Sequence, residues 1–249
     1  MSQYYDPSPT SEFYFDVANR NYPNHSCLTI FGAGVSTTTL STVWGKGGLY
    51  SYPTAASVMK VSSSSGSDLY GTGGAQSVFI QGLDANWNAV SETVNLNGQN
   101  AVNTSKTYIR INRVTVVAGA VNIGNIHVGI GTVSAGVPAT TYGFIKIGNG
   151  ESIQSMYSIP AGHTAYLIDG SIASGTTAAN KYIVGRLMAR PFGGVLITSM
   201  ITSLATGQNT YNFKAPIRIE EKSDIEARAL SSSGTDEVAT HFQFILVKE

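Results

Sequence analysis

The sequence is poor in cysteine, in charge and in long apolar runs, and each shortage excludes something. Cys27 is the only cysteine among 249 residues, so the chain can form no internal disulfide. No run approaches the ~18 consecutive apolar residues of a membrane helix. The first residues lack a basic region followed by an apolar stretch. We therefore expect synthesis without a signal peptide and no membrane as a partner.

Charged residues make up only 12% of the chain, where about 25% is usual in globular domains. So few charges cannot cover many surface helices, and they suit sheets and the centres of interfaces instead. The 15 basic and 15 acidic residues balance one another and are scattered along the chain. The sequence therefore gives no electrostatic reason to expect nucleic acid as a partner.

Motifs for catalysis and metal binding are also missing from the sequence. No Gly-x-Ser-x-Gly elbow is present, and no pair of histidines has the spacing of metal ligands. The acidic segment that contains Asp224 and Glu226 predicts a polar turn and a solvated strand edge, rather than a pair of catalytic carboxylates. We expect no enzymatic activity, no cofactor and no metal.

The chain does contain the composition and the alternation of β-strands. It has 27 Gly, 13 Tyr and 9 Phe, together with long runs of Ser, Thr and Asn. Val78 and Ile80 point to one side of an extended segment, and Phe79 and Gln81 point to the other. We predict strands at 57–62, 76–83, 89–96, 106–117, 123–131, 153–159, 163–173, 181–190, 195–204, 210–213, 224–231 and 238–248. Their number and spacing predict an all-β fold of two antiparallel β-sandwich domains in tandem, each resembling a jelly roll.

Three parts of the chain are predicted from these patterns: an extended N-terminal arm at residues 1–35, a first β-sandwich at 36–137 and a second at 138–249. The segment 132–143 is predicted to be the linker or crossover between the two domains. Prolines interrupt the arm, yet it is rich in aromatic residues, so we expect it to dock on its own domain or on a neighbouring subunit. The candidate contacts of the arm are Tyr4, Tyr5, Phe13, Tyr14 and Phe15.

A second candidate contact lies in the turn Asp84-Ala85-Asn86-Trp87-Asn88. Its spacing resembles the beginning of a calcium loop, but the positions of the expected glycine and glutamate are occupied by Ala89 and Asn95. A turn held by Asx side chains is the simpler interpretation. We expect Trp87 to be exposed there, where it could stack on a sugar ring or fill a pocket on a neighbouring subunit. Asp84, Trp87 and Asn88 are therefore possible exposed contacts.

Several segments resemble virion structural proteins of tailed double-stranded DNA phages, especially phages of aquatic bacteria. The resemblance covers residues 43–249 and is strongest at 71–98 (GTGGAQSVFIQGLDANWNAVSETVNLNG), 107–114 (TYIRINRV), 159–167 (IPAGHTAYL), 215–229 (APIRIEEKSDIEARA) and 242–249 (FQFILVKE). It implies a place in the particle and supplies no catalytic residues.

From this resemblance we expect a head cement or decoration protein, made in the host cytoplasm and located on the capsid surface. It would stabilise the capsid lattice through subunit contacts, as a homotrimer bound to the major capsid protein. The alternative is a receptor-binding or carbohydrate-binding module of a tail or fibre. Such a module would expose an aromatic residue beside Asp or Asn at a loop tip, whereas a cement protein would present broad, mostly uncharged faces.

Overall fold

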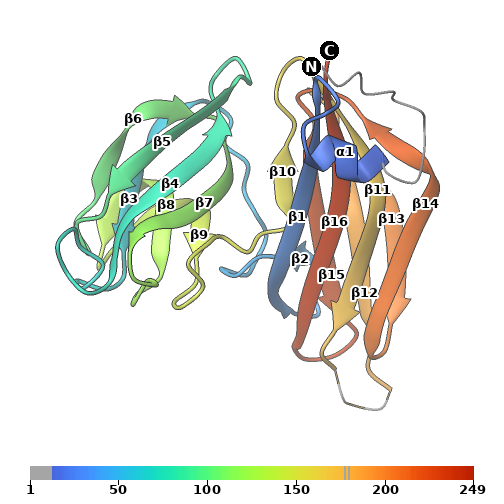
Figure 1. The fold of residues 1–249 in the computed structure, drawn as a ribbon. Helices are drawn as coiled ribbons and strands as arrows, with labels where there is room; N and C mark the ends of the chain where they lie inside the picture. The colour runs from blue at the N-terminus through green and yellow to red at the C-terminus, as the bar shows by residue number, and fades with distance from the viewer. Residues whose placement is uncertain (1–12, 177, 179) are drawn as a thin grey trace.

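The computed structural model describes residues 13–176, 178 and 180–249, and within them the predicted all-β class is confirmed. A short helix, α1 (Phe13–Ala18), precedes the strands (Figure 1). The first strands are β1 (His25–Ser36), β2 (Ser41–Thr42), β3 (Ser57–Ser63), β4 (Ala75–Leu83), β5 (Ala89–Asn95), β6 (Val102–Tyr108), β7 (Arg110–Gly119), β8 (Ile126–Ser134) and β9 (Val137–Ile145). They are followed by β10 (Met156–Ser158), β11 (His163–Ser174), β12 (Ile183–Arg190), β13 (Ile197–Leu204), β14 (Gly207–Ile219), β15 (Asp224–Ser231) and β16 (Asp236–Lys248). In the described part of the chain, no helix is long and apolar enough to cross a membrane.

Strands β3 to β9 form an N-terminal unit, which lies on the left of Figure 1. Their order is β6-β3-β8-β9 in one sheet and β5-β4-β7 in a second. The paired strands are antiparallel, as the alternating pattern predicts. Apolar side chains from both sheets share one buried cluster, which includes Met59, Val61, Val78, Ile80, Val114 and Val128.

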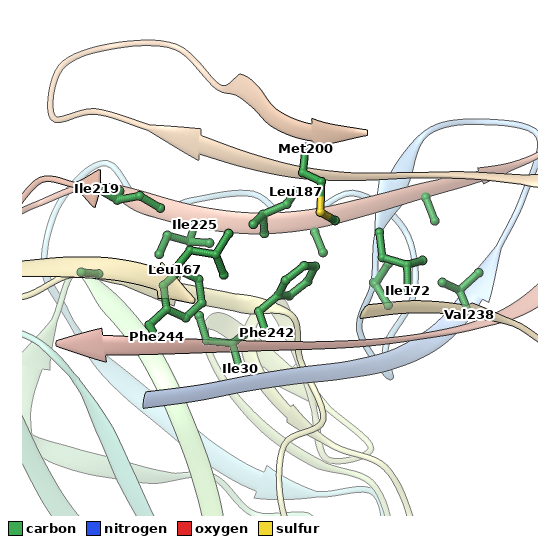
Figure 2. Close-up of a cluster of buried hydrophobic side chains, with 14 of the residues drawn as sticks. Ile30, Leu167, Ile172, Leu187, Met200, Ile219, Ile225, Val238, Phe242 and Phe244 are labelled. Carbon is green, nitrogen blue, oxygen red and sulfur yellow. The ribbon is translucent and has the colours of Figure 1, made fainter. Parts of the chain in front are cut away.

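The remaining strands form a C-terminal unit with the sheet orders β1-β16-β11-β14 and β10-β15-β12-β13, and β2 pairs with β15. A second hydrophobic cluster is shared by these two sheets (Figure 2). Strand β16 is paired on both sides, and one of its faces is buried through Val238, Phe242 and Phe244. The other face is exposed or partly exposed at Ala239, His241 and Gln243. The cluster includes Ile30, Leu167, Phe242 and Phe244 from the first sheet, and Leu187 and Ile225 from the second.

Strand β1 differs from the predicted arm, whose boundary at residue 35 falls inside this strand. The strand pairs with β16 along its whole length, from His25 opposite Val247 to Ser36 opposite Asp236. Gly32 and Gly34 interrupt the apolar alternation that would have identified β1 as a strand. The packing around Gly32 explains why a glycine stands there. A Cβ atom on Gly32 would lie 2.6 Å from the carbonyl oxygen of Val43, so a larger residue does not fit where β1 crosses this segment. Residues 25–36 are thus a paired strand of the C-terminal unit.

The segment 132–143 is a β-hairpin, and its prediction as a linker was wrong. Strands β8 and β9 pair up to Ser134 opposite Val137. The two residues of the turn, Ala135 and Gly136, have φ angles of 47° and 76°, the left-handed conformation that tight hairpins require. Pro138 is tolerated because β9 is an edge strand. The predicted domain boundary at residue 137 therefore falls at the start of β9, and the chain passes to the C-terminal unit after residue 145.

Candidate functional site

The described part of the predicted arm packs on its own C-terminal unit. Helix α1 contacts β1, and its Val17 is buried. The ring of Phe13 lies edge-on to Tyr22 at a centroid distance of 5.0 Å. Tyr14 and Phe15 remain exposed, at 52% and 68%. Among the predicted arm contacts, Phe13 thus packs locally and two aromatic residues face solvent, while Tyr4 and Tyr5 lie outside the described residues.

A groove of about 350 Å³ lies between Tyr14 of α1 and the sheet that contains β1 and β16. Tyr14, Cys27, Asp169 and Asn212 contribute to its lining. Burial raises the pKa of the Asp169 carboxyl, and the neighbouring His241 acts in the opposite direction. The groove combines an aromatic ring with polar groups, but no ligand chemistry is specified by these contacts.

The turn at Asp84 has the predicted Asx structure. The Asp84 carboxylate accepts hydrogen bonds from the backbone N–H groups of Asn86 and Asn88 at 2.8 and 2.9 Å. The Asn88 side-chain amide donates a third hydrogen bond at 3.3 Å. Partial burial acts to raise the pKa of Asp84, but these hydrogen bonds from Asn88 and Asn86 outweigh it and lower that pKa. The carboxylate therefore holds its own turn, as the sequence predicts.

Trp87, in contrast, is buried, and the expectation that it is exposed was wrong. Only 6% of the residue is accessible to solvent. Its φ angle of 66° lies in the left-handed region, which non-glycine residues seldom adopt. The Arg110 guanidinium carbon lies 4.6 Å from the centre of the indole ring, and the Phe192 ring packs edge-on at 5.7 Å. The indole of Trp87 thus joins the units, and of the three predicted loop contacts only Asp84 and Asn88 remain accessible at the loop tip.

A buried ion network lies next to Trp87 at the junction of the two units. Arg110 on β7 donates two hydrogen bonds to the Asp224 carboxylate on β15, at 2.7 and 3.0 Å. Arg190 and Ser158 donate to the same carboxylate. Tyr52 lies under both arginines, and burial raises its pKa well above the ordinary value, so its hydroxyl stays protonated. The Tyr52 hydroxyl itself is buried without a hydrogen-bond partner among the described residues. The charge-assisted bonds to Asp224 link the N-terminal unit to the C-terminal unit.

The acidic segment of β15 is therefore buried, and its prediction as a solvated edge was wrong. Asp224 and Glu226 are 2% and 0% exposed. Glu226 accepts hydrogen bonds from Arg228 at 2.8 and 3.0 Å and from the hydroxyl of Thr42. The alternation of charged and apolar residues in β15 predicted the strand correctly. It could not predict that the polar face would be covered by residues from the other unit.

A cleft of about 300 Å³ lies between the two units, along β1, β5 and β7. Gln154, at its base, donates hydrogen bonds to the carbonyl oxygens of Ile111 and Asn112 at 3.2 and 3.3 Å. Within the described residues, the oxygen of the same amide, Oε1, is buried without a partner. Burial raises the pKa of Tyr157, which also lines the cleft, to about 12. The lining is neutral apart from Arg113, which is paired with Glu151.

Four large apolar side chains are exposed on β13 and in the turn that precedes it. They are Phe192, Val195, Ile197 and Ile201, which are 65%, 72%, 58% and 57% exposed. The register places Ile201 opposite Arg186 and Ile197 opposite Ala189, on opposite faces of the sheet, so they do not form a single surface. The sequence contained a signal for this exposure, because residues 191–213 include no Lys, Arg, Asp or Glu. The strand itself was predicted, but its exposure was not.

No group of three or more His, Cys, Asp or Glu side chains that could hold a metal ion is found in residues 13–176, 178 and 180–249. His127 is buried on β8, and its Nδ1 lies 3.3 Å from the Thr141 hydroxyl. Burial, assisted by the charge of Lys46, lowers the pKa of His127 to about 4. The imidazole is therefore neutral at neutral pH and has a packing role beside Phe144.

No protein-family model and no curated protein sequence matches the chain. Among solved structures, the chain is similar to the VP2 subviral particle of infectious bursal disease virus, with 11% sequence identity, 96% of this chain and 78% of that chain covered, and a TM-score of 0.24. The Gx strain of the same virus gives 10% identity, coverages of 90% and 73%, and a TM-score of 0.25. At these scores the likeness does not establish a shared fold.

Proposed function

We propose that the chain is a structural protein of a phage virion, and that it acts as a head cement or decoration protein. The observation that carries this proposal is the exposure of large apolar side chains on β13 and in the turn before it, on a body whose two units are otherwise well packed. Each Å² of apolar surface removed from water contributes about 25 cal/mol before the costs of association. Repetition on a lattice would multiply modest contacts of this kind. The role is mechanical, and no catalytic step is part of it.

The architecture supports the same proposal. We interpret the two pairs of sheets as two jelly-roll-like sandwiches in tandem, each with its own hydrophobic cluster. The buried Arg110–Asp224 pair would keep the two sandwiches at a fixed angle. A rigid body of this kind can bridge neighbouring capsid subunits and resist their separation.

The partners in this proposal are the major capsid protein and further copies of the chain, assembled as a homotrimer on the capsid surface after synthesis in the host cytoplasm. The arm residues Tyr4, Tyr5, Phe13, Tyr14 and Phe15 are its proposed contacts, and Tyr14 and Phe15 are exposed for such a role. The carbohydrate-binding alternative loses its main support, because Trp87 is buried at the junction and cannot stack on a sugar.

The proposal is tested on purified particles of the phage that encodes the chain. Mass spectrometry of these particles should detect the chain in repeated copies, and gold-labelled antibodies against it should decorate the head. Label on the tail or fibre would contradict the cement role and retain a virion role. Particles that lack the chain would contradict both.

A further inference from the structure

We propose that Arg186 and Arg228 form a binding site for an oxyanion, that is, for a phosphate group or a carboxylate. The two arginines lie on neighbouring strands, β12 and β15. This inference goes beyond the proposed function and does not depend on it, because the site can be tested on the isolated chain. It follows from the order of charges on one face of the sheet.

One face of β12 and β15 carries a row of charged side chains, which we call the charged ladder. The ladder comprises Arg186 and Arg190 on β12, and Arg228, Glu226 and Asp224 on β15. Arg186 lies directly opposite Arg228 in the antiparallel register, and Arg190 lies opposite Asp224. The next residue on each strand, such as Leu187, points into the hydrophobic cluster of the C-terminal unit. Because side chains alternate along a strand, the charged ladder occupies the other face of the sheet.

The two carboxylates of the charged ladder are already paired. Asp224 accepts hydrogen bonds from Arg190, and also from Arg110, which reaches it from the N-terminal unit. The two oxygens of Glu226 accept hydrogen bonds from Arg228 at 2.8 and 3.0 Å. Three arginines therefore use both carboxylates.

Arg186 is the fourth arginine of this region, and it lacks a carboxylate. Among the described residues it forms no ion pair, and its Nε atom is buried without a hydrogen-bond partner. Like charges directly opposite one another on neighbouring strands repel, because their Cβ atoms are only about 4.5–5.5 Å apart. An anion held between Arg186 and Arg228 would offset this repulsion and accept hydrogen bonds that Arg186 now lacks.

The donors that remain specify an oxyanion. A guanidinium group is planar, and its N–H donors form a fork that matches the oxygens of a carboxylate or a phosphate. Arg228 uses Nε and Nη2 for Glu226, which leaves Nη1 for a ligand. A phosphate carries more oxygens and more charge than a carboxylate, so it can accept from both arginines and should bind more tightly.

The position of Ile201 gives the ligand access to the site. Ile201 lies opposite Arg186 on β13, an edge strand of the sheet, and it is 57% exposed. Arg186 is itself partly exposed. An anion can therefore approach from the side of β13 without separating the two units of the chain.

The experiment follows the Nε–H signals of the arginine side chains in the ¹⁵N-labelled full chain by nuclear magnetic resonance. Inorganic phosphate is added at constant ionic strength. We expect the signals of Arg186 and Arg228 to move in a saturable way, with a Kd on the order of 1 mM. The signal of Arg218, an exposed arginine paired with Glu220, should move little. Acetate should move the same two signals with a weaker Kd, whereas chloride should give no saturable change.

Variants separate a built site from a general attraction of anions to arginine. Arg186→Gln should weaken phosphate binding, measured at Arg228, at least about tenfold, because one of the two forks is lost. Arg186→Lys keeps the charge without the fork and should weaken the binding less. Arg218→Gln is the matched control and should leave the binding unchanged. Urea unfolding establishes that each variant is folded.

Four results would overturn the inference. The first is the absence of a saturable change at about a hundred times the expected Kd, where one site would be full. The second is an equal response of Arg218, and the third is binding of chloride as tight as that of phosphate. The fourth is unchanged phosphate binding in folded Arg186→Gln or, if that variant does not fold, in Arg186→Lys.

Discussion

Arg110 and Asp224 are separated by 114 residues in the sequence, yet the guanidinium and the carboxylate meet through hydrogen bonds of 2.7 and 3.0 Å. Both side chains are buried, with 7% and 2% of their surface exposed. The pair lies where β7 of the N-terminal unit meets β15 of the C-terminal unit. It links the two units through a buried pair of opposite charges.

Asp224→Asn should destabilise the chain strongly. The substitution leaves Arg110 and Arg190 facing a neutral group in a buried space, and breaking a buried pair in this way costs about 3–5 kcal/mol. Urea unfolding followed by circular dichroism measures the loss. Glu151→Gln is the matched control, because its pair with Arg113 is partly exposed and should contribute less than about 1 kcal/mol. Equal effects of the two substitutions would show that the junction is not held by this network.

Trp87→Ala should also destabilise the junction. It removes the indole that fills the space between Arg110 and Phe192, a loss comparable to other buried aromatic truncations at about 3–5 kcal/mol. The free energy of unfolding in urea measures the effect. Tyr70→Ala, at a residue that is 66% exposed, should change stability by about 0.5 kcal/mol or less. A mild effect of Trp87→Ala would return Trp87 to the surface and reopen the sugar-binding alternative.

Asp84 should contribute to stability only through its turn. Asp84→Ala removes the acceptor for the N–H groups of Asn86 and Asn88, and we expect a cost of about 1 kcal/mol, similar to the loss of a helix cap. Asp84→Asn retains an acceptor oxygen and should cost less. Thermal melting of both variants provides the comparison. If Asp84→Asn were the more damaging substitution, the negative charge rather than the Asx turn would be the important feature.

His127 should make stability depend on pH. Its folded pKa of about 4 lies below the unfolded value of 6.5, so the folded state binds fewer protons and stability falls as the pH is lowered. The contribution is fully present above pH 6.5, is lost progressively down to about pH 4, and corresponds to at most about 3 kcal/mol. Urea unfolding at several pH values should show this decline in the parent and a flatter profile in His127→Gln. Identical profiles between pH 6.5 and 4 would contradict the buried, neutral state of the imidazole.

The strands could be predicted from the sequence because each carries its own signal. The alternation around Val78 and Ile80 predicted β4 closely, and β5 followed from the Asx turn and its Val and Thr residues. Strand β1 was missed because Gly32 interrupts its apolar pattern. The hairpin of β8 and β9 was missed because the turn at Ala135 and Gly136 lies in a run of small residues that is also typical of linkers.

The environment of the candidate residues could not be predicted in the same way, because it depends on contacts between distant segments. The order of residues around Trp87 predicts a turn, but its burial follows from Arg110 and Phe192, which belong to other strands and loops. Similarly, the alternation in β15 predicts that its polar face is exposed to solvent. In the structure, residues from the other unit cover this face. The exposure of Ile201 depends on the edge position of β13, which local alternation does not specify.

Cryo-electron microscopy of the intact particle tests the central claim most directly. The account predicts density for both units of this chain at repeated positions on the head lattice, in contact with the major capsid protein and with neighbouring copies. Density for the chain only at the tail or at a fibre tip, or a head lattice without it, would contradict the cement role.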